Sequence, residues 1–426
     1  MGMSKSLPYS SYVSLLKREL IPALGCTEPI SLAYAAAWAR KVIGRLPDGF
    51  TLECSPGIIK NTKGVIIPFS GGLKGMVAAI SLGLVGGNAC RGLNVLDSIT
   101  SENKEAAINY MAHVRSDISQ AESTDSLYIC LTVYSGNDKA TVVIKGHHTG
   151  IVRLTHNGLN LPLPAEDCES GDDNCPIDSM TVDEIVRFAD TVPLPLIIDI
   201  FEQQVAYNMR IAEEGLSGDY GLNIGRNILS GESSLDIRTM VKAYAAAGSD
   251  ARMGGCPMPV IINSGSGNQG LTVSLPVIVY AKDLNVSREK LIRALACGNL
   301  IALHLRLPMG GLSAFCGVVC AACGAGAGIT YLRGGDARKI SMTITNTLAS
   351  ITGMICDGAK ASCALKIATA VDSALIGHEL AMQGKTFDDG DGIVGTDVEE
   401  TIKNVIRIAV EGMACTNQEI LGIMNS

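Results

Sequence analysis

The chain is poor in aromatic residues and has no concentrated block of basic residues. Aromatic residues make up 4% of its 426 residues, and the 47 glycines indicate that small residues carry much of the packing through close helix–helix contacts. The net charge is −8 at pH 7. Since no run of Lys or Arg stands out, the composition argues against a nucleic-acid-binding surface, and we expect no polyanionic partner.

The chain also lacks the features of an exported, disulfide-bonded protein. Residues 1–7 do not contain the long apolar run of a signal peptide. The sequence has 14 cysteines, but it is too long and too rich in core residues for a small disulfide scaffold. We therefore expect a reducing cytoplasm, where each cysteine is a core residue, a metal ligand or a reactive thiol.

Two stretches without charged residues are candidates for membrane-spanning segments. The stretch between Arg306 and Arg333 is long enough to span a bilayer. It contains Pro308, Gly310 and many Ala, Gly and Cys residues, and the stretch between residues 252 and 282 is rich in Asn, Ser, Gly and Pro. We expect both to be buried segments that line a site, and no membrane partner.

The periodicity of apolar residues predicts an α+β fold in two parts. Residues 1–180 are expected to form an α+β domain with a small, largely antiparallel sheet, and residues 181–426 a helical domain. A polar, acidic segment at residues 162–180 is expected to be a loop or linker. Strands are expected at 50–54, 64–69, 127–134, 140–145 and 151–156. Helices are expected at 12–20, 27–43, 74–84, 102–113, 181–190, 195–213, 235–247, 287–304, 313–332, 336–352 and 396–414.

Two cysteine-containing segments, residues 312–316 and 354–363, are the most informative part of the sequence. Cys356 and Cys363 are seven residues apart, which would separate them by about 10 Å along a helix, too far for a disulfide. This spacing could suit two thiolates at different corners of one iron–sulfur cluster, if a helix begins near Cys363. A cluster with three protein ligands leaves one iron open as a Lewis acid.

Two further segments have residues suited to chemistry. Cys26 directly precedes a predicted helix, where the helix dipole would lower the pKa of its thiol. The alternative is a buried thiol at a helix cap. Residues 263–270 form a polar, glycine-rich, uncharged segment whose N–H groups and hydroxyls could bind a carboxylate. The alternative there is a solvated turn.

A third cysteine pattern points to a different enzyme class. Cys316, Cys320 and Cys323 have the C-x₃-C-x₂-C spacing of the radical S-adenosylmethionine cluster motif. Here the pattern lies in an Ala/Gly/Val run that is typical of a helix, and Ala322 stands where that motif has an aromatic residue. We therefore expect Cys320 and Cys323 to be small core residues.

Together these segments resemble the L-cysteine desulfidase family, which is distantly similar to iron–sulfur L-serine dehydratases. The resemblance rests on residues 25–29, 249–255, 263–270, 354–359 and 362–364, in this order along the whole chain. It implies breakdown of L-cysteine to pyruvate, ammonia and hydrogen sulfide with a 4Fe–4S cluster and no pyridoxal phosphate. It also implies that Cys316, Cys356 and Cys363 hold the cluster, and that Cys26 is a catalytic thiol or an alternative ligand.

The same resemblance suggests how a small amino-acid substrate is bound. Ser264, Ser266 and Asn268 would hold its carboxylate, Arg252 would assist as a bidentate clamp, and Asn61 would make a polar contact. Cysteine and serine remain alternative substrates, and a homo-oligomer is left open. The competing hypotheses are an L-serine dehydratase-like deaminase, a radical S-adenosylmethionine enzyme and a non-enzymatic cluster-binding sensor.

Overall fold

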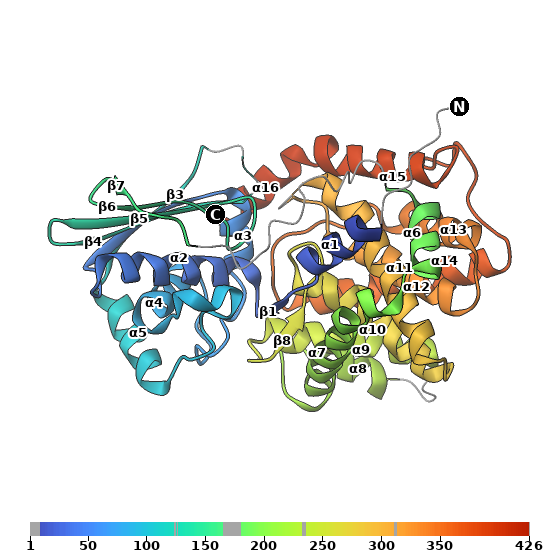
Figure 1. Ribbon diagram of the computed structural model, residues 1–426, viewed down its shortest axis with the longest axis horizontal. Coiled ribbons are helices and arrows are strands. Elements are labelled where there is room, and N and C mark those ends of the chain that lie inside the picture. Colours follow the sequence, from blue (N-terminus) through green and yellow to red (C-terminus); the bar gives the residue numbers. More distant parts are fainter. Residues whose placement is uncertain are drawn as a thin grey trace.

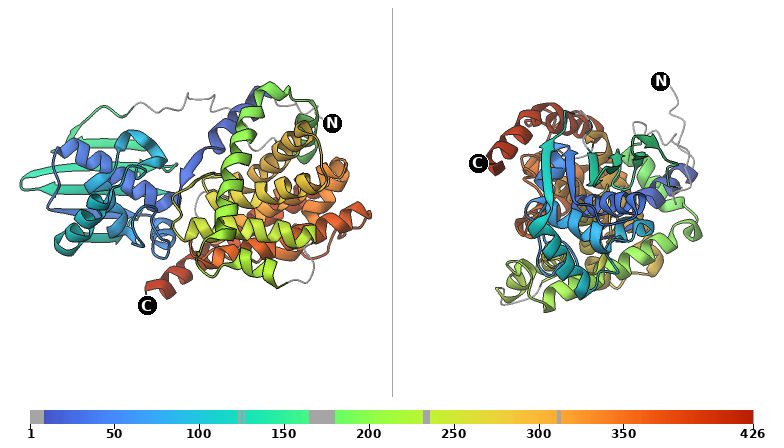
Figure 2. Two further views of the ribbon diagram at one scale, coloured as in Figure 1. Left: turned by 90° about the horizontal axis from the view of Figure 1, so that it is seen from below. Right: turned by 90° about the vertical axis from the view of Figure 1, so that its left-hand side faces the viewer.

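The computed structural model describes residues 9–122, 125, 127–164, 180–231, 236–310 and 313–425. It confirms the α+β class: a sheet covered by helices lies beside a larger helical body (Figures 1 and 2). Much of the predicted linker, residues 165–179, lies outside the described residues.

One six-stranded sheet organises the smaller body. Its order is β3-β2-β4-β5-β6-β7, with antiparallel pairing except between β2 and β3, which are parallel. The helix α2 packs on β4 and β5, and α4 and α5 form a further layer behind it (Figure 1). The strands are β2 Gly49–Cys54, β3 Arg115–Gln120, β4 Tyr128–Ser135, β5 Asp138–Lys145, β6 Ile151–His156 and β7 Leu159–Asn160. The helices are α2 Thr27–Ile43, α3 Pro56–Thr62, α4 Met76–Gly86 and α5 Ser101–His113.

The larger body is built from long helices around α12. Most of α12 is buried, and α10, α11, α13 and α14 pack against it. A Cβ atom at Gly324 would lie 2.3 Å from the carbonyl oxygen of Gly298 on α11, so glycine permits this close approach. The helices are α6 Val182–Thr191, α7 Ile198–Ser217, α8 Ile224–Ser230, α9 Ile237–Met253, α10 Gly267–Asp283, α11 Arg288–Arg306, α12 Gly317–Leu332, α13 Ala337–Ile351, α14 Ser362–Met382, α15 Val398–Arg407 and α16 Ala414–Asn425.

Several predicted elements differ from the structure. Residues 64–69 do not form a strand but make a single bridge, between Ile66 and Lys74, and Phe69 has a φ of 60°. The predicted loop at 263–270 ends at Ser266, because α10 begins at Gly267. The helix expected at 313–332 begins only at Gly317, and the one expected at 396–414 is interrupted by a π-helical turn at residues 408–412.

The chain passes between the two bodies more than once. The first helix, α1 (Tyr9–Glu19), packs on the helical body, where the rings of Tyr12 and Phe188 are 4.9 Å apart. Strand β1 (Pro22–Leu24) then pairs with β8 (Pro259–Ile261), and at the other end of the chain α16 lies against α3 (Figure 1). The division at residue 180 stays a prediction.

One helical segment among the described residues, Arg288–Met309, is long and apolar enough to cross a membrane. Inside the protein, however, 83% of its most apolar stretch is buried. The core helix of a globular protein has the same length and composition, so this feature is weak evidence for a membrane span.

Candidate functional site

A short backbone pairing brings two of the predicted cluster ligands together. Phe315 and Ile355 form an isolated antiparallel bridge. Its flanking hydrogen bonds run from Cys316 N to the oxygen of Met354 at 3.1 Å, and from Cys356 N to the oxygen of Ala314 at 2.6 Å. The interaction between the two thiols raises the pKa of Cys316 and lowers that of Cys356. The two cysteines are therefore direct neighbours, although 40 residues separate them in sequence.

Cys363 lies in the same neighbourhood, in the first turn of α14. Helix α14 begins at Ser362, so the condition that a helix starts near Cys363 is met. The thiol of Cys363 contacts the carbonyl oxygen of Gly358 at 3.7 Å, and it acts electrostatically on both Cys316 and Cys356. We call Cys316, Cys356 and Cys363 the cysteine site. We predict that all three converge within about 7 Å of one another, as the ligands of one four-iron cluster must.

The described residues contain no group of three His, Cys, Asp or Glu side chains placed to bind a single metal ion. An iron–sulfur cluster differs from such an ion, because its thiolate ligands attach to separate iron atoms of a bulky group. The relevant observation is that three free thiols, one buried and two partly buried, come from three positions in the chain to one neighbourhood.

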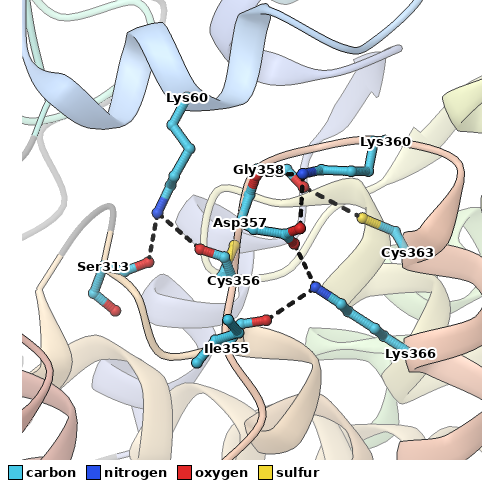
Figure 3. A network of polar contacts seen from close by, with 9 residues as sticks. All are labelled: Lys60, Ser313, Ile355, Cys356, Asp357, Gly358, Lys360, Cys363 and Lys366. Atoms are coloured by element: carbon cyan, nitrogen blue, oxygen red, sulfur yellow. Dashed lines mark hydrogen bonds and ion pairs between the residues drawn. The ribbon is translucent and has the colours of Figure 1, made fainter. Parts of the chain in front are cut away.

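Lysine side chains surround the cysteine site (Figure 3). Lys60 reaches it from α3 and donates to the carbonyl oxygens of Ser313 and Cys356, at 3.1 and 3.0 Å. Asp357 lies between Lys360 and Lys366 and forms ion pairs with both. Burial acts to raise the pKa of Asp357, but the two lysines outweigh it and lower this pKa to about 2.

Cys26 lies next to the cysteine site, at the N-cap of α2. It packs with Met253 and Cys363 in a small buried cluster, and its thiol donates to Oε2 of Glu28 at 2.9 Å. Burial, together with the negative charge of Glu28, raises the pKa of this thiol well above its ordinary value. The sequence-based expectation of a lowered pKa is therefore wrong, because these effects outweigh the charge of Arg252, which acts to lower the pKa.

Glu28 is the centre of a buried polar group that the sequence did not single out. Its carboxylate also accepts hydrogen bonds from Asn61 Nδ2 at 2.8 Å and from Thr27 Oγ1 at 3.1 Å. Burial alone would raise the pKa of Glu28. The charges of His148 and Arg252, with the hydrogen bond from Cys26, bring this pKa below its ordinary value. Asn61 thus orients a carboxylate of the protein, and its predicted contact with the substrate stays a prediction.

Arg252 lies between this polar group and the glycine-rich segment. Its side chain is 2% exposed, and its Nε has no hydrogen-bond partner among the described residues. A Cβ atom at Gly267 would lie 2.2 Å from this Nε, so the first turn of α10 lies directly against the guanidinium group. A buried guanidinium with an unused donor is suited to an anionic ligand.

The predicted carboxylate-binding residues are partly brought to this place. Ser266 is the N-cap of α10 and makes no side-chain capping bond there, while Ser264 has a φ of 50° and donates to Oδ1 of Asn263 at 2.8 Å. The oxygen of Gly265 accepts from Thr27 Oγ1 at 3.0 Å, which ties the segment to α2. Asn268 instead accepts from Ser249 and is hydrogen-bonded within the core.

A buried amide network supports the segment from behind. Asn263 donates to Oδ1 of Asn299 on α11 at 3.0 Å. Asn299 and Gln204 on α7 exchange two hydrogen bonds, at 3.0 and 3.1 Å, and Asn299 also donates to the oxygen of Leu295 at 2.9 Å. Asn263, Asn299 and Gln204 are each 0% exposed. The glycine-rich segment is therefore an anchored structure, and the alternative of a solvated turn is wrong.

Sequence reasoning missed Glu28, Lys60 and His148. Glu28 and Lys60 lie beside Cys26 and Asn61 in the sequence, and both of those were predicted site residues. The hydrogen-bond partners of Glu28 and Lys60 were not predicted. The oxygen of His148 accepts from Ser31 on α2 at 2.6 Å, and the imidazole lies close to Gly265. No local motif marks this histidine.

Comparisons with known proteins agree with this arrangement. The model of the serine dehydratase alpha chain family matches residues 90–422, a range that contains the whole cysteine site. A UPF0597 protein from Lachnoclostridium phytofermentans is 46% identical over 417 residues, which cover 98% of this chain and 99% of the relative. UPF0597 proteins from Treponema denticola and Finegoldia magna are 45% and 43% identical, over 100% and 97% of this chain and 99% of each relative. The chain therefore belongs to the serine dehydratase alpha chain family, together with these UPF0597 proteins.

Proposed function

We propose that the protein is an iron–sulfur-dependent lyase that converts L-cysteine and water to pyruvate, ammonia and hydrogen sulfide. Membership of the serine dehydratase alpha chain family supports a lyase of the deaminating type. The observation that carries the finer proposal is the backbone pairing that makes Cys316 and Cys356 neighbours, with Cys363 beside them. Cys26 and the Glu28 carboxylate adjoin this group.

The cysteine site fits a 4Fe–4S cluster by its chemistry. Thiolates are the usual ligands of such clusters, and three free thiols from two segments of the chain, one buried and two partly buried, are available here. When bound by three thiolates, the cluster supplies a Lewis-acidic iron that favours departure of the substrate's sulfur. No pyridoxal phosphate is required by this proposal.

Arg252 and the glycine-rich segment are proposed to hold the substrate's carboxylate. The guanidinium group provides charge and directional donors, and the first turn of α10 provides N–H groups beside it. Ser264 and Ser266 complete the predicted contacts. Asn268 supports the segment from within the core, since its side chain is bonded to Ser249.

The Cys26–Glu28 pair is proposed to remove the α-proton of the substrate. Because the pKa of Cys26 is raised, its sulfur is protonated at neutral pH and already donates to Glu28. As the sulfur of Cys26 accepts the α-proton, its own proton passes to the Glu28 carboxylate. The electron pair of the broken C–H bond forms the double bond of aminoacrylate as sulfide leaves from the β-carbon. Aminoacrylate then tautomerises to an imine, which water hydrolyses to pyruvate and ammonia.

L-Serine dehydration by the same groups is the second candidate, favoured by the description of the matched family. The chemistry would differ only in the leaving group, which is water instead of hydrogen sulfide. A radical S-adenosylmethionine enzyme is not proposed, because Cys320 and Cys323 are fully buried in the core around α12.

Anaerobic purification followed by assays with L-cysteine and L-serine tests the proposal. We expect bound iron and sulfide, and pyruvate with sulfide released from L-cysteine at the higher kcat/KM. Cys356→Ser should lose the iron, whereas Cys90→Ser, at an exposed cysteine, should keep it. Cys26→Ala should keep the cluster but lower kcat by roughly 100-fold, the usual scale for a positioned acid–base group. Iron-free wild-type protein that is active would refute the cluster, and preference for L-serine would favour the second candidate.

A further inference from the structure

Lys60 is among the largest fully buried side chains of the protein, although it is a lysine. Its side chain enters from α3 in the smaller body and is 1% exposed. Lysine is almost never fully buried unless its charge is paired, because removing an ammonium ion from water costs several kcal/mol. Its surroundings must therefore compensate for that cost.

The hydrogen bonds of Lys60 match an ammonium ion, but among the described residues they leave its charge without a bonded counter-ion. Its Nζ contacts three acceptors, the oxygens of Ser313 and Cys356 and Oδ1 of Asn417, at 3.1, 3.0 and 2.8 Å (Figure 3 shows the first two). An ammonium group has three N–H donors, so each has one partner. All three acceptors are neutral.

The nearby carboxylates are already engaged by other groups. Asp357 is paired with Lys360 and Lys366, and Glu28 accepts hydrogen bonds from Cys26, Thr27 and Asn61. The other ionisable groups that act on Lys60 are the thiols of Cys356 and Cys316. The thiols of Cys356 and Cys316 are therefore the nearby ionisable groups that no other lysine of the described residues already pairs with.

The three acceptors belong to segments that meet at the cysteine site. Ser313 lies three residues before Cys316, the second acceptor is the backbone of Cys356 itself, and Asn417 lies on α16 near the end of the chain. One side chain thus ties the two ligand segments to each other and to the C-terminal helix. Since Lys60 comes from the smaller body, it also joins that body to the site.

We propose that Lys60 is a positioning residue for the cluster: its ammonium group fixes the Cys316 and Cys356 segments and offsets the negative charge of the thiolate-bound cluster. This inference rests on the proposed function, since it assumes that the cysteine site binds a cluster. Outer residues of metal sites commonly change metal affinity by about 10–100-fold when they are replaced. Such a residue also raises the cluster's reduction potential, because a positive charge stabilises the more negative, reduced form.

The test compares Lys60→Met and Lys60→Gln with the control Lys17→Met, which changes an exposed lysine on α1. Lys60→Gln keeps N–H donors near the carbonyl oxygens while removing the charge, so it serves where Lys60→Met does not fold. Each anaerobically purified protein is measured for iron retention against a chelator and for the midpoint potential of the cluster by redox titration. Asn417→Ala separates the contact with α16 from the charge.

We expect both Lys60 variants to retain iron at least about 10-fold more weakly than wild type, with a midpoint potential shifted to more negative values. Lys17→Met should match wild type in both measurements, and Asn417→Ala should keep the wild-type potential. Wild-type iron retention and potential in Lys60→Gln would overturn the inference while leaving the proposed function intact. An equal potential shift in Asn417→Ala would overturn the role of the charge. A wild-type protein that binds no cluster would overturn the proposed function and the role of Lys60 with it.

Discussion

The buried amide network behind the glycine-rich segment gives a quantitative prediction. Asn299→Ala removes the partner of both ends of the Gln204 amide, which is 0% exposed and has no route to water. Each buried polar group left without a partner costs about 1–3 kcal/mol, so we expect a loss of about 4 kcal/mol in the free energy of unfolding. That is a large fraction of the roughly 5–15 kcal/mol that stabilises a folded protein.

Gln204→Ala should cost less, because Asn299 keeps its bonds to Asn263 and Leu295. Two lost hydrogen bonds at about 1 kcal/mol each give about 2 kcal/mol. In the double variant the unsatisfied Gln204 amide is gone, so the loss of stability should be smaller than that of Asn299→Ala alone. The coupling between the two sites is then more than about 2 kcal/mol.

These differences are measured by urea unfolding of the wild type, the two single variants and the double variant, followed by circular dichroism. The control is Gln203→Ala, which changes the exposed neighbour of Gln204 on α7 and should stay within about 0.5 kcal/mol of wild type. If the loss in free energy of unfolding in the double variant instead equals the sum of the two single losses, the two amides are energetically independent. That result would refute the argument that Asn299→Ala leaves the Gln204 amide without hydrogen-bond partners.

Three further predictions concern single side chains. Ser264→Ala should raise KM for L-cysteine more than it lowers kcat, because a carboxylate is bound alike in the ground and transition states. Asp250→Asn should raise the melting temperature at pH 8 but not at pH 4, because burial raises the pKa of Asp250 to about 6 in the folded protein. Glu28→Gln should lower kcat by roughly 100-fold while iron content stays at the wild-type level.

The sign of the Asp250 effect follows from proton linkage. Between the unfolded and folded pKa values the folded state binds more protons, so stability falls as the pH rises through about 6. Asparagine cannot ionise and avoids this loss, while it can still accept the bond from Gly225 N. A melting-temperature difference that does not change with pH would contradict the assignment. For Ser264→Ala the contradicting result is a fall in kcat with unchanged KM.

The helices and strands with strong local signals were predictable from the sequence, and those without them were not. Thr27 and Pro29 mark the start of α2, and alternating apolar residues mark β4, with half of its side chains facing the core. Strand β3 is almost entirely exposed and polar, so it has no alternation to detect. Helix α14 begins without a side-chain cap, and it was absent from the predicted helices apart from the suggestion of a start near Cys363.

The candidate site was predictable as a set of cysteines but not as a set of contacts. Cys316 and Cys356 lie in recognisable segments, yet their pairing depends on a bridge between residues 40 apart, and Lys60 reaches its acceptors across more than 250 residues. No periodicity encodes such distances. The carboxylate of Glu28 and its neighbouring donors Cys26 and Thr27 were visible in the sequence, but its hydrogen bond from Asn61 arises only from the packing of α2 against α3.

Cys26 shows why a local rule gave the wrong pKa direction and why Glu28 is then required for proton transfer. A helix dipole stabilises a charge at its end by at most about 2 kcal/mol, or about 1.5 pKa units. Full burial can raise a thiol pKa by up to about 3–5 units, and the Glu28 carboxylate at 2.9 Å adds to the rise. A protonated thiol accepts a proton only if its own proton leaves, and Glu28 is the acceptor already in contact with it.

Cys26→Ala and Glu28→Gln should therefore impair the same step. The rate of pyruvate formation in a single turnover should be no lower in the double variant than in the slower single variant. Multiplied losses in the double variant would show that the two groups act in separate steps.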